Sequence, residues 1–308
     1  MNSQTPETQS ASPSLKAPLK VSVVIPSYNM AKYLPQTLDS VLSQDYENFE
    51  VIVVDDDSTD DTAAIVAQYA GKVSYVHRPN GGESAARNSG IKAGTGEAFM
   101  FVDADDLLPE KAISTMANRL AQLGEDYCLV HGEMESFDDS TGKPFAVSNF
   151  KDIAQNRRKI FTEMSNMILA SLVRTQALQM VELFPEHVKW SAITEIIMKL
   201  AKCGKFYSLD RVVYQYRIRP DSMSKGVSYE RSLLLTQQSR DRLTTLLKGE
   251  SLHTKIEAWA AHYLRAGINF HQFNRHLARR FLLLSLLIYP FNLVPLKLLR
   301  ASFLNKLN

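Results

Sequence analysis

The sequence predicts an α/β fold in which a mostly parallel sheet is flanked by helices, with a helical extension at the C-terminal end. Short apolar runs rich in β-branched residues alternate with amphipathic stretches from Val21 to about residue 106, which is the pattern of strands joined by helical crossovers. The 308 residues are 45% hydrophobic and 22% charged, as in an average globular protein. Leu-rich helical segments dominate from about residue 228.

Composition narrows the class of protein. The first twenty residues are rich in Ser, Thr, Pro and Gln without an apolar stretch of signal-peptide length, so we expect a disordered leader over 1–20. No segment reaches the roughly 18 uninterrupted apolar residues that span a bilayer. A net charge of +2 disfavours a nucleic-acid partner. Cys128 and Cys203 lie outside any CxxC spacing, which fits a cytoplasmic protein without a disulfide framework.

The predicted strands are near-continuous apolar runs, as expected where helices cover both faces of a sheet. They lie at 21–25, 50–54, 73–77 and 98–102. The spacing of Leu34, Leu38, Val41 and Leu42 predicts a helix before the second strand. Oxygens of residues 58–60 are expected to cap the next helix.

Polar residues follow all four strands. The exits carry Pro26 to Asn29, Asp55 to Ser58, Asn80 to Gly82 and Asp103 to Asp106. Because the carboxyl ends of parallel strands converge on one crevice, these residues predict a ligand site.

The second half predicts a helix over 110–123, a strand over 127–131 and a polar loop over 136–144. A further helix carries Ile193, Ile196, Ile197 and Leu200 on its apolar face and ends at Gly204. The strand 212–219 follows it. This half is expected to complete the sheet.

The acidic cluster Asp103-Ala104-Asp105-Asp106 is the strongest candidate for chemistry. Its carboxylates could hold a hard divalent cation, Mg²⁺ or Mn²⁺, against a diphosphate. A solvated acidic turn is the plain alternative, but Asp55 and Asp56 leave the neighbouring strand, and crowded carboxylates favour a cation or ligand.

Three further residues suggest a nucleotide. The Tyr28 ring could lie against a nucleobase, or only pack its own loop. Asp56 could accept hydrogen bonds from the base edge. Arg87, early in a helix that begins near Ser84, could meet a diphosphate at the helix N-terminus, or form an ion pair.

The stretch from Val21 to Asp106, with VSVVIPSYN, VIVVDDDS, NGGESAARNSG and FMFVDADD in this order, resembles the inverting family 2 glycosyltransferases. The resemblance implies the GT-A type nucleotide-diphospho-sugar transferase fold over 21–225, with a donor half at 21–125 and an acceptor half at 126–225. It implies nucleotide-sugar contacts from Pro26, Tyr28, Asp56, Arg87, Asp103, Ala104 and Asp105, and a metal at Asp105 and Asp106.

The implied reaction moves a sugar with inversion from a nucleotide donor, a UDP-sugar by preference, to a hydroxyl of a cell-surface glycan or lipid-linked acceptor. Members of this family carry a Glu-Asp pair whose Asp is the general base, and Ala192 and Ile193 stand there instead. Glu195 follows three residues after Ala192, one helical turn on, and could replace the base or pair with Lys199. Glu186 and His187 are weaker substitutes because they precede the helix, and His131 and Glu133 are expected nearer the sugar site.

The C-terminal extension, 226–308, ends in Leu-rich runs with Arg275, Arg279, Arg280, Lys297 and Arg300, interrupted by Pro290 and Pro295. Residues 275–308 could lie on the inner face of an anionic membrane or pack against the catalytic domain.

Two other classes remain in view. A non-catalytic nucleotide-sugar-binding descendant is supported only by the absent Glu-Asp pair. A phosphohydrolase ranks last, because its Asp-x-Asp would end the first strand. A dinucleotide dehydrogenase is disfavoured, since no GxGxxG follows a strand.

Overall fold

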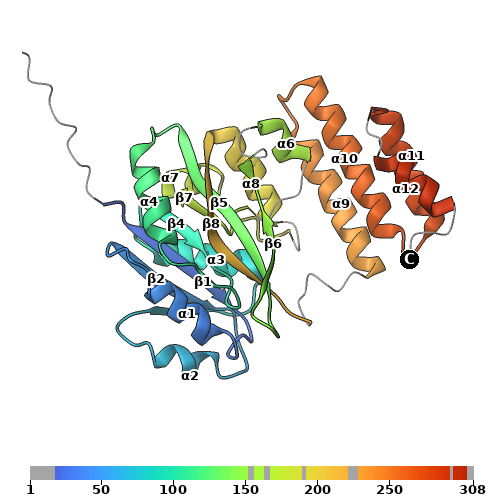
Figure 1. The fold of residues 1–308 in the computed structure, drawn as a ribbon. Helices are drawn as coiled ribbons and strands as arrows, with labels where there is room; N and C mark the ends of the chain where they lie inside the picture. The colour runs from blue at the N-terminus through green and yellow to red at the C-terminus, as the bar shows by residue number, and fades with distance from the viewer. Residues whose placement is uncertain are drawn as a thin grey trace, which may run out of the picture.

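A mixed eight-stranded sheet carries the fold, in the order β3-β2-β1-β4-β7-β5-β6, with β8 paired to β5 (Figure 1). The computed structural model describes residues 18–151, 156–162, 167–188, 192–220, 228–291 and 294–303. The strands are β1 (Val21–Ser27), β2 (Phe49–Asp55), β3 (Ser74–His77), β4 (Ala98–Phe101), β5 (Tyr127–Asp138), β6 (Pro144–Ser148), β7 (Ser171–Arg174) and β8 (Lys205–Ile218). The four strands predicted in the first half are confirmed.

The strands from β3 to β4 are parallel, and β8 runs parallel to β5. β7 is antiparallel to β4 and β5, and β6 is antiparallel to β5. The sheet therefore has the predicted parallel part, to which a mixed second half is joined. Residues 136–138 of the predicted polar loop belong to β5, because they pair with β6 and β8.

Helices cover the sheet. They are α1 (Leu34–Leu42), α2 (Thr62–Ala67), α3 (Glu83–Ala93), α4 (Ala112–Gln122), α6 (Arg157–Thr162), α7 (Thr175–Met180) and α8 (Ala192–Cys203). The predicted capping of α2 by residues 58–60 is wrong, because the N-cap residue is Asp61 and its side chain makes no capping hydrogen bond. The neighbouring Asp60 carboxylate accepts the Thr62 N–H at 3.1 Å. Ser58 and Thr59 bond to Asn29 instead and join the first two strand exits.

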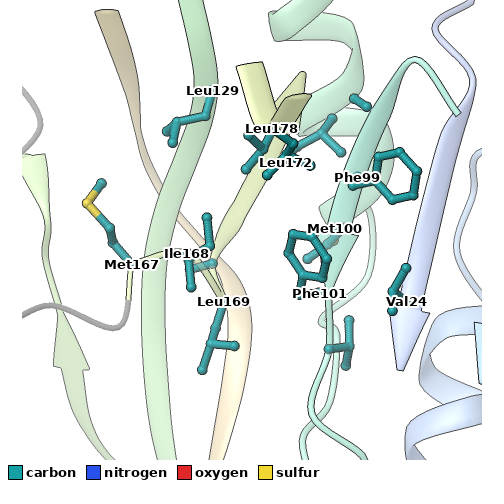
Figure 2. Close-up of a cluster of buried hydrophobic side chains, with 14 of the residues drawn as sticks. Val24, Phe99, Met100, Phe101, Leu129, Met167, Ile168, Leu169, Leu172 and Leu178 are labelled. Carbon is teal, nitrogen blue, oxygen red and sulfur yellow. The ribbon is translucent and has the colours of Figure 1, made fainter. Parts of the chain in front are cut away.

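The core lies where β4 meets β7 (Figure 2). Val24, Phe99, Met100 and Phe101 are buried there. The Phe101 ring meets Phe184 edge to face at a centroid distance of 4.9 Å. This apolar centre fixes the exit of β4, from which the acidic cluster extends.

Residues 18–20 pack against the sheet. The prediction of disorder is therefore wrong for these three residues. Leu19 is buried, its carbonyl accepts the Tyr46 hydroxyl at 2.6 Å, and the Lys20 N–H donates to Glu97. The rest of the predicted leader, 1–17, lies outside the described residues.

The C-terminal extension is helical as predicted: α9 (Tyr229–Leu246), α10 (Leu252–Phe270), α11 (Arg275–Ile288) and α12 (Val294–Phe303). Side chains of Ser228, Ser251 and Asn274 cap the first three of these helices. Ala278, Leu282 and Ser285 form the buried face of α11, and the Ser285 hydroxyl donates to the Ala260 carbonyl of α10 at 2.8 Å. Among the described helices, none is both long and apolar enough to cross a membrane.

Candidate active site

The acidic cluster lies between β4 and β8. Leu107 and Gln215 exchange backbone hydrogen bonds of 3.0 and 2.9 Å, which hold the loop after β4 against the last strand. The Asp103 N–H donates to the Tyr214 hydroxyl at 3.1 Å, and this hydroxyl donates to Asp106 at 2.7 Å. The site is thus built from residues more than a hundred positions apart.

Asp106 is a structural carboxylate in this arrangement. It is completely buried, and its other oxygen accepts the Arg217 N–H at 2.8 Å. Burial raises the pKa of Asp106 well above its usual range, and the neighbouring Asp103 and Asp105 raise it further. Both oxygens accept hydrogen bonds inside the protein, and the role of Asp106 as a metal ligand stays a prediction.

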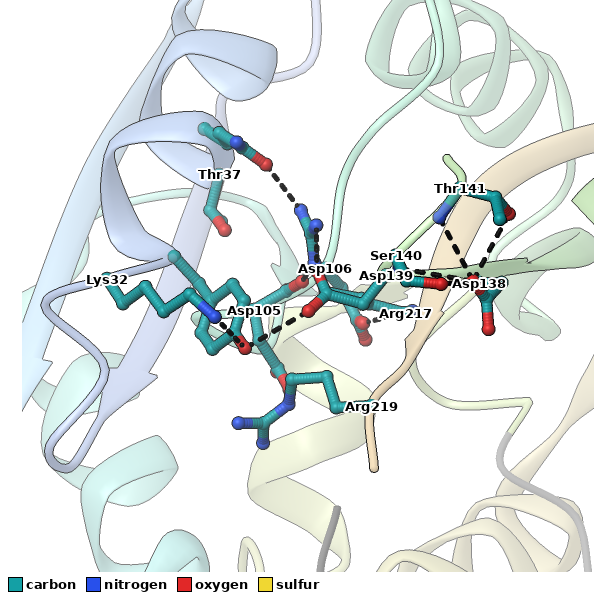
Figure 3. Close-up of polar contacts among 12 residues, drawn as sticks. Lys32, Thr37, Asp105, Asp106, Asp138, Asp139, Ser140, Thr141, Arg217 and Arg219 are labelled. Atoms are coloured by element: carbon teal, nitrogen blue, oxygen red, sulfur yellow. Dashed lines mark hydrogen bonds and ion pairs between the residues drawn. The ribbon is translucent and has the colours of Figure 1, made fainter. Parts of the chain in front are cut away.

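Asp105 is held by Arg217 of β8 and by Arg219, which follows the strand (Figure 3). Arg219 forms an ion pair with its carboxylate at 2.9 Å, and Arg217 donates to its carbonyl at 2.6 Å. Burial raises the pKa of the Asp105 carboxyl, and the Arg219 charge opposes the shift. Its side chain keeps some exposure, so it can still reach a ligand.

Arg217 connects the acidic cluster to α1. Its guanidinium donates to Asp139 at 2.9 Å and to Gln36 of α1 at 2.7 Å (Figure 3). The Thr37 hydroxyl donates to the carbonyl of Ala104, which is buried. These contacts fix the backbone of the acidic loop from both sides.

Arg87 forms the ion pair that the sequence offered as the alternative to a diphosphate contact. It lies in the second turn of α3, is fully buried, and pairs with Asp103 at 2.8 Å and with Glu83. The helix position directs its guanidinium at the exit of β4, where it holds Asp103, while its Nε and Nη1 have no hydrogen-bond partner among the described residues. Its contact with a diphosphate stays a prediction. Burial raises the pKa of Asp103, and Arg87 acts against the shift.

The exits of β1 and β2 form the adjoining wall. Tyr28, at 49% exposure, presents an open ring, and Pro26 is half-buried before it. The Asp56 carboxylate accepts hydrogen bonds from the N–H groups of Gly81 and Gly82 at 3.0 and 2.7 Å. It also forms an ion pair with Arg78. Gly82 has a φ of 84°, which favours glycine there and lets its N–H face Asp56.

The two candidate bases lie in different surroundings. Glu195 of α8 is paired with Lys199 at 3.1 Å, and its charge also acts on the buried Arg242 of α9. Glu186 is exposed and accepts a hydrogen bond of 2.8 Å from Asn88, the residue next to Arg87 in α3. Asn88 also exchanges hydrogen bonds with the backbone of Phe184, whose ring lies 5.4 Å from the Arg87 guanidinium carbon.

The remaining substitutes are less suited. His131 is completely buried, and burial lowers its pKa to about 4. Glu133 accepts from Asn149 at 2.8 Å, and His187 is exposed. Ala192 and Ile193 begin α8, so the positions of the family's Glu-Asp pair carry no carboxylate.

Sequence reasoning missed Arg78, Tyr214, Arg217 and Arg219. The strand VVYQYRIR offered a signal, since Tyr214 and two arginines in a strand expected to be buried need polar partners.

Residues 22–180 match the profile described as Glycosyl transferase family 2. The chain belongs to this family. It is 27% identical over 248 residues to Glycosyltransferase GlyA of Streptococcus pneumoniae, covering 74% of this chain and 34% of GlyA. The chain thus spans about a third of the length of that relative.

Solved structures are similar in fold. S. aureus TarS, residues 1–349, has a TM-score of 0.65 at 22% identity, covering 94% of this chain and 88% of TarS. The mannosyltransferase PcManGT from Pyrobaculum calidifontis, solved with GDP-Man and Mn²⁺, has a TM-score of 0.60 at 19% identity, covering 99% of this chain and 84% of PcManGT. These similarities confirm the predicted GT-A type fold.

Proposed function

We propose that this chain transfers a sugar from a nucleoside diphosphate donor, a UDP-sugar by preference, to an acceptor hydroxyl with inversion. The observation that carries the proposal is the position of Asp103 and Asp105 at the exit of β4, where arginines hold both carboxylates. The exits of the adjacent β1 and β2 carry Tyr28 and Asp56. Family membership supports it, as do structures of TarS in complex with UDP and with UDP-GlcNAc.

Each side chain has a role in this proposal. Tyr28 stacks on the nucleobase, because its ring is open on the rim. Asp56, with both oxygens on the loop of Gly81 and Gly82, shapes the base pocket and offers its remaining lone pairs. Asp103 binds the ribose, and Arg87 keeps this carboxylate in place.

The residues fit a divalent cation held jointly by protein and donor. Buried carboxylates crowd the site, and a cation would relieve their repulsion. No group of three or more His, Cys, Asp or Glu arranged for a metal occurs in the described part of the chain. That is expected of Mg²⁺, which uses one or two carboxylates together with substrate phosphates. Asp105 would supply the protein ligand, and the cation would stabilise the departing diphosphate.

The proton of the acceptor hydroxyl needs a base within hydrogen-bond reach. We assign it to Glu186 in preference to Glu195, because Asn88, the residue after Arg87, donates to Glu186, whereas Lys199 pairs with Glu195. A base supplies a factor of about 100 to 10,000 in rate. The rate of sugar transfer by Glu186→Gln is therefore expected to fall by that factor, while its affinity for the donor is unchanged. If only Glu195→Gln lost transfer, Glu195 would be the base instead.

A nucleotide-sugar-binding protein without transfer activity is the second candidate, supported by Ala192 and Ile193. Calorimetric titration of UDP with and without Mn²⁺ tests the donor site, and Asp105→Asn is expected to remove the metal dependence. Metal-independent or absent binding of UDP, GDP and their sugars would refute the site. Turnover of donor in the presence of glycan or lipid-linked acceptors then distinguishes an enzyme from a binding protein.

A further inference from the structure

The outer face of α11 is apolar, and no element in the described part of the chain covers it. Leu283, Leu284 and Leu287 are exposed on it, Leu287 at 77%, and Phe291 at 82% continues it beyond the helix end. Arg280 shares this face, since positions 280, 283, 284 and 287 follow the i, i+3, i+4, i+7 spacing. The opposite face packs on α10, and Figure 1 shows α11 and α12 on the far side of α10 from the sheet.

α12 extends this surface. Val294 and Lys297, one turn apart, are both exposed, while Pro295 and Leu299 are buried. Apolar side chains therefore form one surface across two adjacent helices, with a basic side chain at each end of the run. We use "outer face" for Arg280, Leu283, Leu284, Leu287, Phe291, Val294 and Lys297.

The stretch of sequence that carries the outer face has charges of one sign. Seven of the 35 Lys and Arg and none of the 33 Asp and Glu lie from Ala258 to the end, so this stretch carries +7 while the preceding residues carry −5. A surface with this field attracts an anionic partner. A second copy of the chain is disfavoured as the occupant, because a symmetric contact would bring the two positive stretches together.

The shape of the surface further limits the partner. α11 has 14 residues, too few to cross the roughly 20-residue span of a bilayer but enough to lie in its interface. Interfacial helices bury leucine and aromatic side chains at the boundary of headgroups and acyl chains and hold basic residues at the phosphates. Tyr289 and Phe291 lie at the helix end, where an amphipathic ring prefers that boundary.

We propose that the outer face rests on an anionic lipid bilayer, with Leu283, Leu284, Leu287, Phe291 and Val294 at the acyl boundary and Arg280 and Lys297 at the lipid phosphates. This surface lies outside the donor site, so the proposal goes beyond the proposed transfer and does not depend on it.

Vesicle flotation of the full chain tests the proposal. The protein is expected to float with phosphatidylcholine vesicles that contain phosphatidylglycerol and to float poorly with phosphatidylcholine alone. Leu287→Ser and Phe291→Ser are each expected to lower the partition about tenfold, because each removes most of the free energy of burying one large apolar side chain. Arg280→Gln and Lys297→Gln are each expected to lower it about fivefold and to weaken its dependence on salt.

Met180→Ser is the matched control. Met180 is exposed at 62% on α7, which packs against β7 and α8. Because this side chain is not on the outer face, its replacement is expected to leave flotation unchanged. Leu287→Trp gives an independent measurement, since its emission should shift to shorter wavelength with anionic vesicles. Circular dichroism checks that each variant folds, and titration with UDP reads the donor site separately.

Equal recovery of the parent with both vesicle types, or unchanged flotation of Leu287→Ser and Phe291→Ser, would overturn the proposal. A dimer in sedimentation velocity without lipid that these substitutions dissociate would overturn it as well, because the outer face would then contact a second copy.

Discussion

Replacing Tyr214 by Phe should destabilise the protein and weaken donor binding together. The Tyr214 hydroxyl is fully buried and joins two groups of the acidic cluster, accepting from the Asp103 N–H and donating to Asp106. Phe fills the same space without the hydroxyl, so a backbone N–H and a carboxylate oxygen lose their partners. Each such loss costs about 1–3 kcal/mol, and more for a charged group. We therefore expect the free energy of unfolding to fall by about 3–5 kcal/mol.

The assay is urea unfolding followed by circular dichroism and tryptophan fluorescence, with UDP affinity measured in native buffer. Tyr127→Phe is the control, since it removes a hydroxyl from a partly exposed ring on β5 and should change stability by less than about 0.5 kcal/mol. A Tyr214→Phe variant as stable as the parent, or one with unchanged UDP affinity, would refute the reasoning that this hydroxyl organises the acidic loop.

Three further predictions follow from buried contacts. Arg87→Met should lower stability by about 3–5 kcal/mol and reduce UDP affinity, because Asp103 keeps its burial without its cation; unfolding curves like those of the parent would contradict this. Burial lowers the pKa of His131 from 6.5 to about 4, so its contribution is complete above pH 6.5 and is lost as pH falls toward 4. Between pH 6.5 and pH 4 the free energy of unfolding of His131→Gln should fall by about 3 kcal/mol less than that of the parent. Parallel curves of this free energy against pH would contradict the prediction. A Cβ at Gly90 would lie 2.2 Å from the Val24 Cγ1, so Gly90→Ala should cost about 1–3 kcal/mol. Val24→Ala should restore part of that loss in a double-mutant cycle, and additive costs would show that the clash is relieved elsewhere.

The first half of the fold was predictable because each of its strands is a continuous apolar run ending in a polar exit. The second half was harder, since β5 pairs with three strands and its last residues look like a loop in the sequence. Local pattern carries no information on such distant pairing.

The same limit applies to the site. The sequence predicted that the exits of β1, β2 and β4 meet, because parallel strands guarantee it. It could not show that Arg217 and Arg219 bind the acidic loop, because this depends on how a segment over a hundred residues away is placed. Nor could it show that Arg87 is buried against Asp103, because this depends on how α3 packs on the sheet. The roles of individual residues toward donor and metal stay predictions.

The contacts between β8 and the acidic loop have a consequence for synthesis of the chain. Residues 21–106 leave the ribosome before β8 and hold the exits of β1, β2 and β4, yet Asp105 and Asp106 lack their arginine and tyrosine partners until residue 219 has emerged. The repulsion among these carboxylates therefore persists until β8 has been translated. A nascent chain arrested before β8 should remain unable to capture nucleotide, and the capacity to do so should arise in one late step.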